Sequence, residues 1–233
     1  MKTAIIFGHT SGLGLAIAER LQSDGYKVVG VARSQLADDL PGVEEIAVDL
    51  TDETALISTI QSLRLDYPHF DVLVYSAAVL TAHDLGAVDY RRMEYLYRLN
   101  LFAPMLIESR LLDLIAQNGA DVVNVTSSSL QEYYPQFTEY ATAKVAFSKF
   151  TDDLRRRLEP TSARVIELCP SGFTSSLYQR MLGERIPRDE SKQMSAVDLA
   201  ELVSFVLALP KIVEVAGLSV NRKPVPTSDP SDS

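Results

Sequence analysis

Tyr140 and Lys144 stand four residues apart in a stretch whose apolar periodicity predicts a helix from Phe137 to Leu158. Side chains with this spacing share one face of a helix, so the lysine ammonium can lie beside the phenol. A fixed positive charge favours the phenolate and lowers a phenol pKa from its ordinary value of about 10, toward acid–base use near neutral pH. A ring packed beside a lysine stem, with no chemistry, is the alternative interpretation.

Ser127 lies thirteen residues before Tyr140 and follows an apolar run, Asp121 to Thr126, that predicts a buried strand. We expect its hydroxyl, at the carboxyl end of this strand, to hold an oxygen atom beside Tyr140. A serine hydrolase does not explain Ser127, because the chain has no Gly-x-Ser-x-Gly elbow and no histidine placed to pair with a serine.

A glycine-rich turn, Gly8-His9-Thr10-Ser11-Gly12-Leu13-Gly14, follows the first predicted strand and opens a predicted helix. Glycines let the backbone approach a pyrophosphate, and a helix N-terminus offers N–H groups and a partial positive charge. The turn lacks the Gly-Lys-Ser/Thr of a phosphate-binding loop, which disfavours a nucleoside triphosphatase. It predicts a dinucleotide site in which the cofactor contacts Gly8, Thr10, Ser11, Gly12, Leu13 and Gly14.

The second predicted strand ends at Ala32-Arg33-Ser34, where a dinucleotide-binding fold places the residue that meets the adenosine ribose. An acidic residue there would bond a free 2′-hydroxyl, whereas Arg33 offers a guanidinium to a 2′-phosphate. We therefore expect NADP(H) to be favoured over NAD(H), with a solvated arginine as the alternative. Asp49 and Leu50 follow the third strand and are expected to line the adenine pocket, although Asp49 is equally suited to the N-cap of the next helix.

Apolar runs typical of buried parallel strands alternate with helical segments along the chain. This alternation implies right-handed crossovers and a doubly wound, Rossmann-like α/β fold with about seven strands in a parallel sheet. We expect one domain over residues 1–223 and a disordered tail over 224–233, which is rich in Pro, Ser and Asp. The predicted strands are Thr3–Phe7, Lys27–Ala32, Glu44–Val48, Val72–Tyr75, Asp121–Thr126, Arg164–Cys169 and Val213–Val220. The predicted helices are Gly14–Ser23, Asp52–Leu65, Tyr90–Gln117, Phe137–Leu158 and Ala196–Ala208.

A formal net charge of −9 and the absence of a basic run argue against a nucleic-acid or anionic-membrane surface. Cys169 is the one cysteine, so no internal disulfide is expected, and the scattered histidines suggest no metal site. The first strand begins at Thr3 with no charged leader, and no long apolar stretch follows. We therefore expect a cytoplasmic protein that acts on a small molecule.

Taken together, these residues resemble the short-chain dehydrogenase/reductase family over nearly the whole chain. The pattern Gly8-x3-Gly12-x-Gly14 is similar to the family's cofactor turn. Ser127, Tyr140 and Lys144 match its catalytic signature. Asn100 falls where the family keeps a catalytic asparagine in a helix.

By this resemblance, Tyr140 would donate a proton to a carbonyl oxygen that Ser127 also holds, while hydride arrives from the nicotinamide. Lys144 would lower the tyrosine pKa and bond the nicotinamide ribose. Asn100 would position a water that relays protons to Lys144, with a helix residue that bonds its own backbone as the alternative. The resemblance also places the cofactor against Ser76 and Ala77 after the fourth strand and against Pro170, Phe173 and Ser175 after the sixth.

The chain departs from the family's pattern at several positions, among them Tyr75 and Ser76 in place of two asparagines after the fourth strand and the missing paired glycines after the last strand. Phe7 replaces a threonine before the first glycine, Ala78 replaces a glycine after the fourth strand, and Ser171 replaces a glycine after the sixth. None of these departures removes a proton-transfer group, so they bear on cofactor affinity rather than on the reaction.

The combined pattern predicts an NADP-dependent oxidoreductase that reduces a ketone or aldehyde, or oxidises the corresponding alcohol. A redox-sensing regulator that holds NADP without turnover is the alternative, although it would need only the glycine turn. Tyr133, Tyr134 and Phe137 are expected either to form an apolar substrate wall or to pack against a neighbouring helix or subunit. Apolar residues on more than one face of the helices predicted over residues 90–117 and 137–158 indicate a homodimer or homotetramer.

Overall fold

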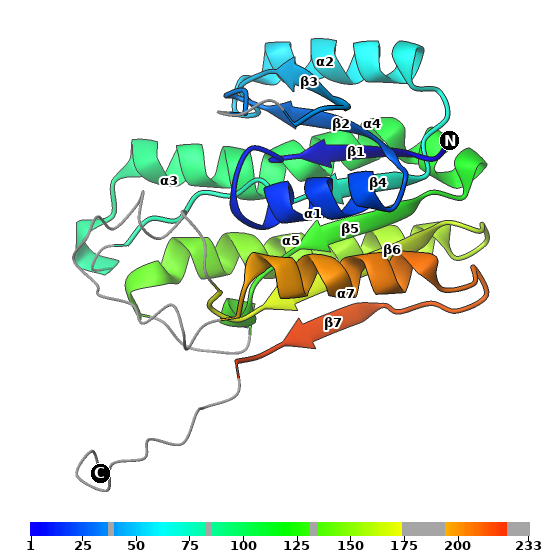
Figure 1. Cartoon of the computed structure of the whole chain (residues 1–233). Helices are drawn as coiled ribbons and strands as arrows, with labels where there is room; N and C mark the ends of the chain where they lie inside the picture. Colours follow the sequence, from blue (N-terminus) through cyan, green and yellow to red (C-terminus); the bar gives the residue numbers. More distant parts are fainter. Residues whose placement is uncertain (37–39, 83–84, 131–134, 174–193, 223–233) are drawn as a thin grey trace, which may run out of the picture.

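The computed structural model describes residues 1–36, 40–82, 85–130, 135–173 and 194–222 (Figure 1). Ser175, Tyr133, Tyr134 and the tail predicted over residues 224–233 lie outside the described residues. Within the described ranges, seven parallel strands form one sheet in the order β3-β2-β1-β4-β5-β6-β7. The predicted doubly wound, Rossmann-like fold is confirmed.

The observed elements follow the predicted ones closely. The strands are β1 (Thr3–Phe7), β2 (Lys27–Ala32), β3 (Val43–Ala47), β4 (Val72–Tyr75), β5 (Asp121–Val125), β6 (Arg164–Pro170) and β7 (Gly217–Val220). The helices are α1 (Gly12–Ser23), α2 (Glu53–Asp66), α3 (Tyr90–Tyr97), α4 (Ala103–Asn118), α5 (Thr138–Leu158) and α7 (Ala196–Ala208). The last strand begins later than predicted, because the Val213 carbonyl accepts a hydrogen bond of 3.0 Å from Arg164 instead of joining the sheet.

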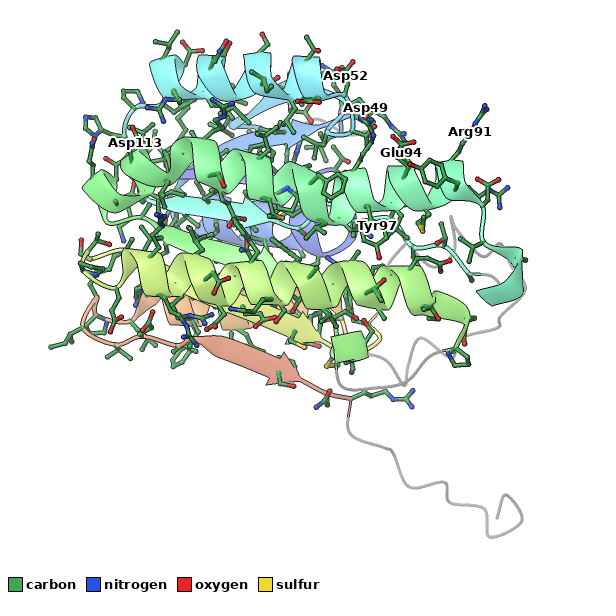
Figure 2. The ribbon with its side chains drawn as sticks, turned by 180° about the vertical axis from the view of Figure 1, so that it is seen from behind. Asp49, Asp52, Arg91, Glu94, Tyr97 and Asp113 are labelled. Carbon is green, nitrogen blue, oxygen red and sulfur yellow. The ribbon has the colours of Figure 1, made fainter. Side chains whose placement is uncertain are left out.

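Helices cover both faces of the sheet (Figure 1). Along β1, Ala4 and Ile6 pack with α1 and α7, whereas Ile5 and Phe7 pack with α2, α4 and α5 on the other face. Successive residues of a strand point to opposite faces, so a strand covered on both sides must be apolar throughout. Figure 2 shows the second face, where Asp113 of α4 accepts hydrogen bonds of 2.6 and 2.7 Å from Arg64 of α2.

The chain order reverses at β1, which lies between β2 and β4. In open parallel sheets, ligands bind in the crevice outside the carboxyl ends of the strands at such a reversal. The residues that follow β1, β2, β4, β5 and β6 therefore gather at one edge of the sheet. Among the helices of the described ranges, none has the length and apolar character needed to cross a membrane.

The long helix predicted to carry Asn100 is interrupted by a π-helical turn over Arg98–Phe102, which separates α3 from α4. The predicted helix over Tyr90–Gln117 is confirmed in its extent, since the backbone stays helical from Tyr90 to Asn118, but the π turn within it was not predicted. Pro104 lacks an N–H, so neither the α-type bond to the Asn100 carbonyl nor the π-type bond to the Leu99 carbonyl can form. The Tyr75 hydroxyl donates to the Leu99 carbonyl instead, at 2.5 Å.

Candidate active site

A cavity of about 460 Å³ opens at the carboxyl ends of the strands. Gly14 and Asn100 are absent from its lining, and Ser175 lies outside the described residues. The other predicted site residues all line it: Gly8, Thr10, Ser11, Gly12, Leu13, Arg33, Asp49, Leu50, Ser76, Ala77, Ser127, Tyr140, Lys144, Pro170 and Phe173. The fold thus brings residues from seven separate segments of the chain to one cavity.

The glycine turn is held against the neighbouring strands by close packing. Gly8 has a φ of +91°, and a Cβ atom there would lie 2.6 Å from the Ala77 backbone. A Cβ atom at Gly14 would lie 2.0 Å from the Gly8 carbonyl oxygen, so Gly14 allows α1 to pack against the turn. Gly12 and Leu13 bring the N-terminus of α1 to the cavity, and the first turn of this helix contains no acidic residue. These features fit the pyrophosphate of a nicotinamide dinucleotide.

His9 is buried beneath this turn, a role that the sequence analysis did not identify. Its ring lies against Gly30 of β2, where a Cβ atom would be 2.4 Å from the ring. Its Nε2 lies 2.8 Å from a Glu45 carboxylate oxygen that also accepts a hydrogen bond of 2.9 Å from the Leu36 N–H. Partial burial opposes ionisation of Glu45, but the hydrogen bonds from His9 and Leu36 lower its pKa. His9 therefore links the glycine turn to the segment that follows β2.

Arg33 lines the cavity beside Tyr95 of α3, and its Nη1 donates to the Tyr95 hydroxyl at 3.2 Å. Tyr95 was not predicted, because it carries no motif and stands within an ordinary helical pattern.

Asp49 accepts hydrogen bonds from the N–H and the hydroxyl of Thr51, at 2.9 and 2.7 Å. The N-cap of α2 is Asp52, so the N-cap alternative for Asp49 is wrong. Figure 2 shows Asp49 and Asp52 at the N-terminal end of α2.

Lys144 is 1% exposed, and its ammonium donates to the Val125 carbonyl at 2.8 Å. The Nζ atom lies 5.8 Å from the centre of the Tyr140 ring and 5.7 Å from that of Phe147. The i, i+4 spacing therefore brings the amine and the phenol together, as the sequence predicts. Burial lowers the pKa of Lys144 to about 7, so this amine exchanges protons near neutral pH.

Ser127 follows β5 and lines the cavity, as Tyr140 does. Its Oγ accepts a hydrogen bond of 3.2 Å from the backbone N–H of Ser129. Since this bond uses an oxygen lone pair, the hydroxyl hydrogen of Ser127 can point to an acceptor in the cavity. The geometry suits a serine that donates to a substrate oxygen.

Asn100 is fully buried in the π turn and bonds the backbone of Val79, which follows β4. Its Oδ1 accepts from the Val79 N–H at 2.9 Å, and its Nδ2 donates to the Val79 carbonyl at 2.7 Å. The Tyr75 hydroxyl donates to the carbonyl of Leu99 in the same π turn, and burial keeps this hydroxyl protonated by raising its pKa well above the ordinary value. The Asn100 side chain thus holds a segment of the cavity wall, since Val79 lines the cavity.

The departures from the family pattern have structural roles. Phe7 is fully buried in the core of the sheet, where it stacks with Tyr75 at a ring distance of 6.2 Å. Ala78 lines the cavity, and the Ser171 hydroxyl accepts a hydrogen bond of 3.0 Å from the N–H of Arg222. Ser171 thereby ties the segment after β6 to the segment after β7.

The chain is similar to short-chain dehydrogenases over most of its length. A family model described as short chain dehydrogenase matches residues 2–185. An uncharacterized short-chain type dehydrogenase/reductase of Sinorhizobium fredii is 29% identical over 231 residues, which cover 94% of this chain and 90% of the relative. Sulfoacetaldehyde reductase 2 of Chromohalobacter salexigens is 28% identical over 235 residues, which cover 93% of this chain and 92% of the relative.

Solved structures share the fold. An alcohol dehydrogenase from the archaeon Thermococcus sibiricus, complexed with 5-hydroxy-NADP, has a TM-score of 0.83 and 23% identity over 94% of this chain and 96% of that one. A 3-ketoacyl-(acyl-carrier-protein) reductase from Brucella melitensis, complexed with NADH, has a TM-score of 0.82 and 22% identity over 94% of this chain and 96% of that one. At these identities the likeness establishes the fold alone.

Proposed function

The chain belongs to the short-chain dehydrogenase family of NAD(P)-dependent oxidoreductases, and we propose that it uses NADP(H) to interconvert a carbonyl compound and an alcohol, with Tyr140 as the acid–base. The observation that carries this proposal is the position of Ser127, Tyr140 and Lys144 on the wall of the same cavity as the glycine turn. A redox-sensing regulator would need the turn but not these three side chains.

Each of the three residues has a role that follows from its contacts. When bound, the nicotinamide supplies hydride to a carbonyl carbon or accepts it from an alcohol carbon. Ser127 donates its hydroxyl hydrogen to the substrate oxygen, and Tyr140 donates a proton to the same oxygen during reduction. Lys144 lies beside the Tyr140 ring with a pKa of about 7, so it favours the phenolate when charged and returns a proton to the phenol.

Asn100 acts as a positioning residue in this proposal. Both polar atoms of its side chain bond Val79, so a water that relays protons to Lys144 would have to be held by other groups, such as the Asn100 carbonyl. Pro104 cannot donate a helical hydrogen bond to that carbonyl, which supports this arrangement.

The preference for NADP(H) rests on Arg33. A guanidinium beside a 2′-phosphate contributes about 1.5–3 kcal/mol, which favours the phosphorylated cofactor roughly ten- to a hundredfold. The related structures include complexes with 5-hydroxy-NADP and with NADH, so the fold itself does not set this choice.

An apolar carbonyl compound suits the substrate end of the cavity. Phe137 and Leu80 are both buried and line the cavity, together with Phe173. Among the described lining residues, the cations are Arg33 and Lys144, and Arg33 lies at the adenosine end. The sulfonate that the name of the Chromohalobacter salexigens relative implies would therefore find no separate cation here.

A fluorescence titration with NADPH and with NADH, followed by a panel of ketones and aldehydes, tests the proposal. We expect tighter binding of NADPH and oxidation of NADPH by an apolar carbonyl compound. Tight binding without turnover over a broad panel would favour the regulator, and tighter binding of NADH would overturn the assignment of Arg33.

We also propose that the protein forms a homodimer or homotetramer through α4 and α5. Phe102 and Met105 are 54% and 37% exposed near the start of α4, and Val145 on α5 is 49% exposed. Exposed apolar groups on long neighbouring helices are typical of subunit interfaces. Light scattering should give a mass of at least twice 25.7 kDa, and a mass near 25.7 kDa at micromolar concentration would contradict the proposal.

A further inference from the structure

Tyr95 and Arg33 form a pair at the adenosine end of the cavity. Arg33 follows β2 and Tyr95 lies on α3, and both line the cavity together with Ser34, Asp49 and Leu50. The Arg33 guanidinium donates one N–H to the Tyr95 hydroxyl at 3.2 Å. Because the phenol oxygen accepts this bond, its own hydrogen remains to donate to another acceptor.

The carboxylates nearest this pair are engaged elsewhere. Asp49 accepts both of its described hydrogen bonds from Thr51, and Glu94 accepts from Arg98 at 2.9 and 3.1 Å. Among the described residues, no carboxylate forms an ion pair with Arg33. With respect to the described residues, the guanidinium therefore has most of its N–H groups available for an anion.

The position of Tyr95 is fixed by the anchoring of α3. Arg98, in the turn that follows α3, donates to the Thr51 carbonyl at 3.2 Å, which ties the end of this helix to the segment after β3. The Tyr97 hydroxyl lies 2.6 Å from the Thr142 hydroxyl of α5. The Tyr95 ring packs against the buried cluster of Val79, Leu96 and Ala143. A ring held in this way holds the guanidinium in one orientation, so less side-chain freedom is lost when an anion binds.

We propose that the Tyr95 hydroxyl is part of the site for the adenosine 2′-phosphate, where it orients Arg33 and donates its own hydrogen to a phosphate oxygen. This inference rests on the proposed preference for NADP(H). It assigns the discrimination between the two cofactors to a hydrogen-bonded pair of residues from two different elements instead of to Arg33 alone.

The test uses two fragments of the cofactor, adenosine 2′,5′-bisphosphate and adenosine 5′-monophosphate, whose binding is measured by isothermal titration calorimetry. Tyr95→Phe keeps the ring and removes the hydroxyl. We expect it to weaken binding of the bisphosphate roughly 10- to 100-fold, as for one hydrogen bond to a charged group, and to leave binding of the monophosphate within about twofold. Tyr90→Phe is the matched control on the same helix, because Tyr90 is 71% exposed and does not line the cavity, and it should change neither affinity by more than about twofold.

A double-mutant cycle with Arg33→Ala measures the coupling between the two residues. In the Arg33→Ala background, Tyr95→Phe should weaken the bisphosphate by less than in the wild type. The role of Tyr95 would be overturned if the Tyr95→Phe variant bound the bisphosphate as tightly as the wild type does. It would also be overturned if the variant lost affinity for the bisphosphate and the monophosphate by the same factor. If the wild-type protein itself binds both probes equally, the proposed preference for NADP(H) fails, and the inference fails with it.

Discussion

Asn100→Ala should destabilise the fold, because Asn100 bonds both the N–H and the carbonyl of Val79 and so joins the π turn to the segment after β4. Each buried backbone group that loses its partner costs about 1–3 kcal/mol. Val79 borders the cavity, and water can therefore replace part of the lost bonding. We expect the free energy of unfolding to fall by about 2–4 kcal/mol, the lower part of the summed range.

Urea unfolding followed by circular dichroism measures this change. Asn118→Ala is the matched control, since Asn118 also donates from Nδ2 to a backbone carbonyl, that of Pro68 at 3.1 Å, but at an exposed position. Asn118→Ala should lower the free energy of unfolding by less than about 1 kcal/mol, because water replaces the lost partner of the Pro68 carbonyl. Equal destabilisation of the two variants would refute the reasoning.

Asn100→Asp sharpens this test through its pH dependence. A protonated carboxyl can accept from the Val79 N–H and donate to its carbonyl, whereas a carboxylate can only accept. The pKa of the aspartate in the folded state should therefore be raised above its unfolded value of about 4. The variant should match the wild type at low pH and lose stability as the pH rises through the folded pKa. Stability that stays parallel to that of the wild type from pH 4 to pH 8 would count against the two-bond geometry.

Two further predictions concern buried groups away from the cavity. Burial raises the pKa of Glu108 from 4.5 to about 8. Between pH 4.5 and about 8 the folded state therefore binds one more proton than the unfolded state, and the contribution of Glu108 to stability falls as the pH rises through about 8. Glu108→Gln should therefore gain stability relative to the wild type from pH 5 to pH 8 in urea unfolding, and a constant difference would show that Glu108 is ionised in the folded protein. Gly30→Ala places a Cβ atom 2.4 Å from the His9 ring and should cost about 1–3 kcal/mol in thermal unfolding. His9→Ala should recover part of that loss in the double variant, and additive losses would refute the contact.

The sheet could be predicted from the sequence because each strand carries its own signal. A parallel strand covered on both faces needs an apolar run, and β1, β2, β4 and β5 are buried along nearly their whole length. The glycine turn could also be predicted, because Gly8 and Gly14 occupy positions where a side chain would overlap the backbone and only glycine fits. Tyr140 and Lys144 met as predicted because helical spacing alone brings them together.

The π turn was not predicted, because one inserted residue does not change the apolar periodicity of a helix enough to be recognised. Pro104 was the available signal, since a proline inside a predicted helix removes the backbone bond to the fourth residue before it. The bond from Tyr75 to Leu99 joins residues from different elements and has no local signal. The same holds for Asn100 and Val79, which meet only once β4 and the π turn are packed together.

His9 and Tyr95 were missed for a similar reason. His9 stands in a glycine-rich turn, yet its ring is buried only because Gly30 of the neighbouring strand leaves space for it. Tyr95 accepts a hydrogen bond from Arg33, and that pairing depends on where α3 lies relative to the end of β2. Both contacts join segments far apart in the chain, so residue type and spacing could not indicate them.

The proposed function depends above all on the transfer of a proton between Tyr140 and the substrate oxygen. The most direct measurement compares carbonyl-dependent oxidation of NADPH by the wild type and by Tyr140→Phe, with NADPH binding measured on the same samples. Turnover should fall roughly 10²- to 10⁴-fold while the dissociation constant for NADPH stays within about twofold, because the variant loses a general acid but keeps the ring. Unchanged turnover by Tyr140→Phe would contradict the account.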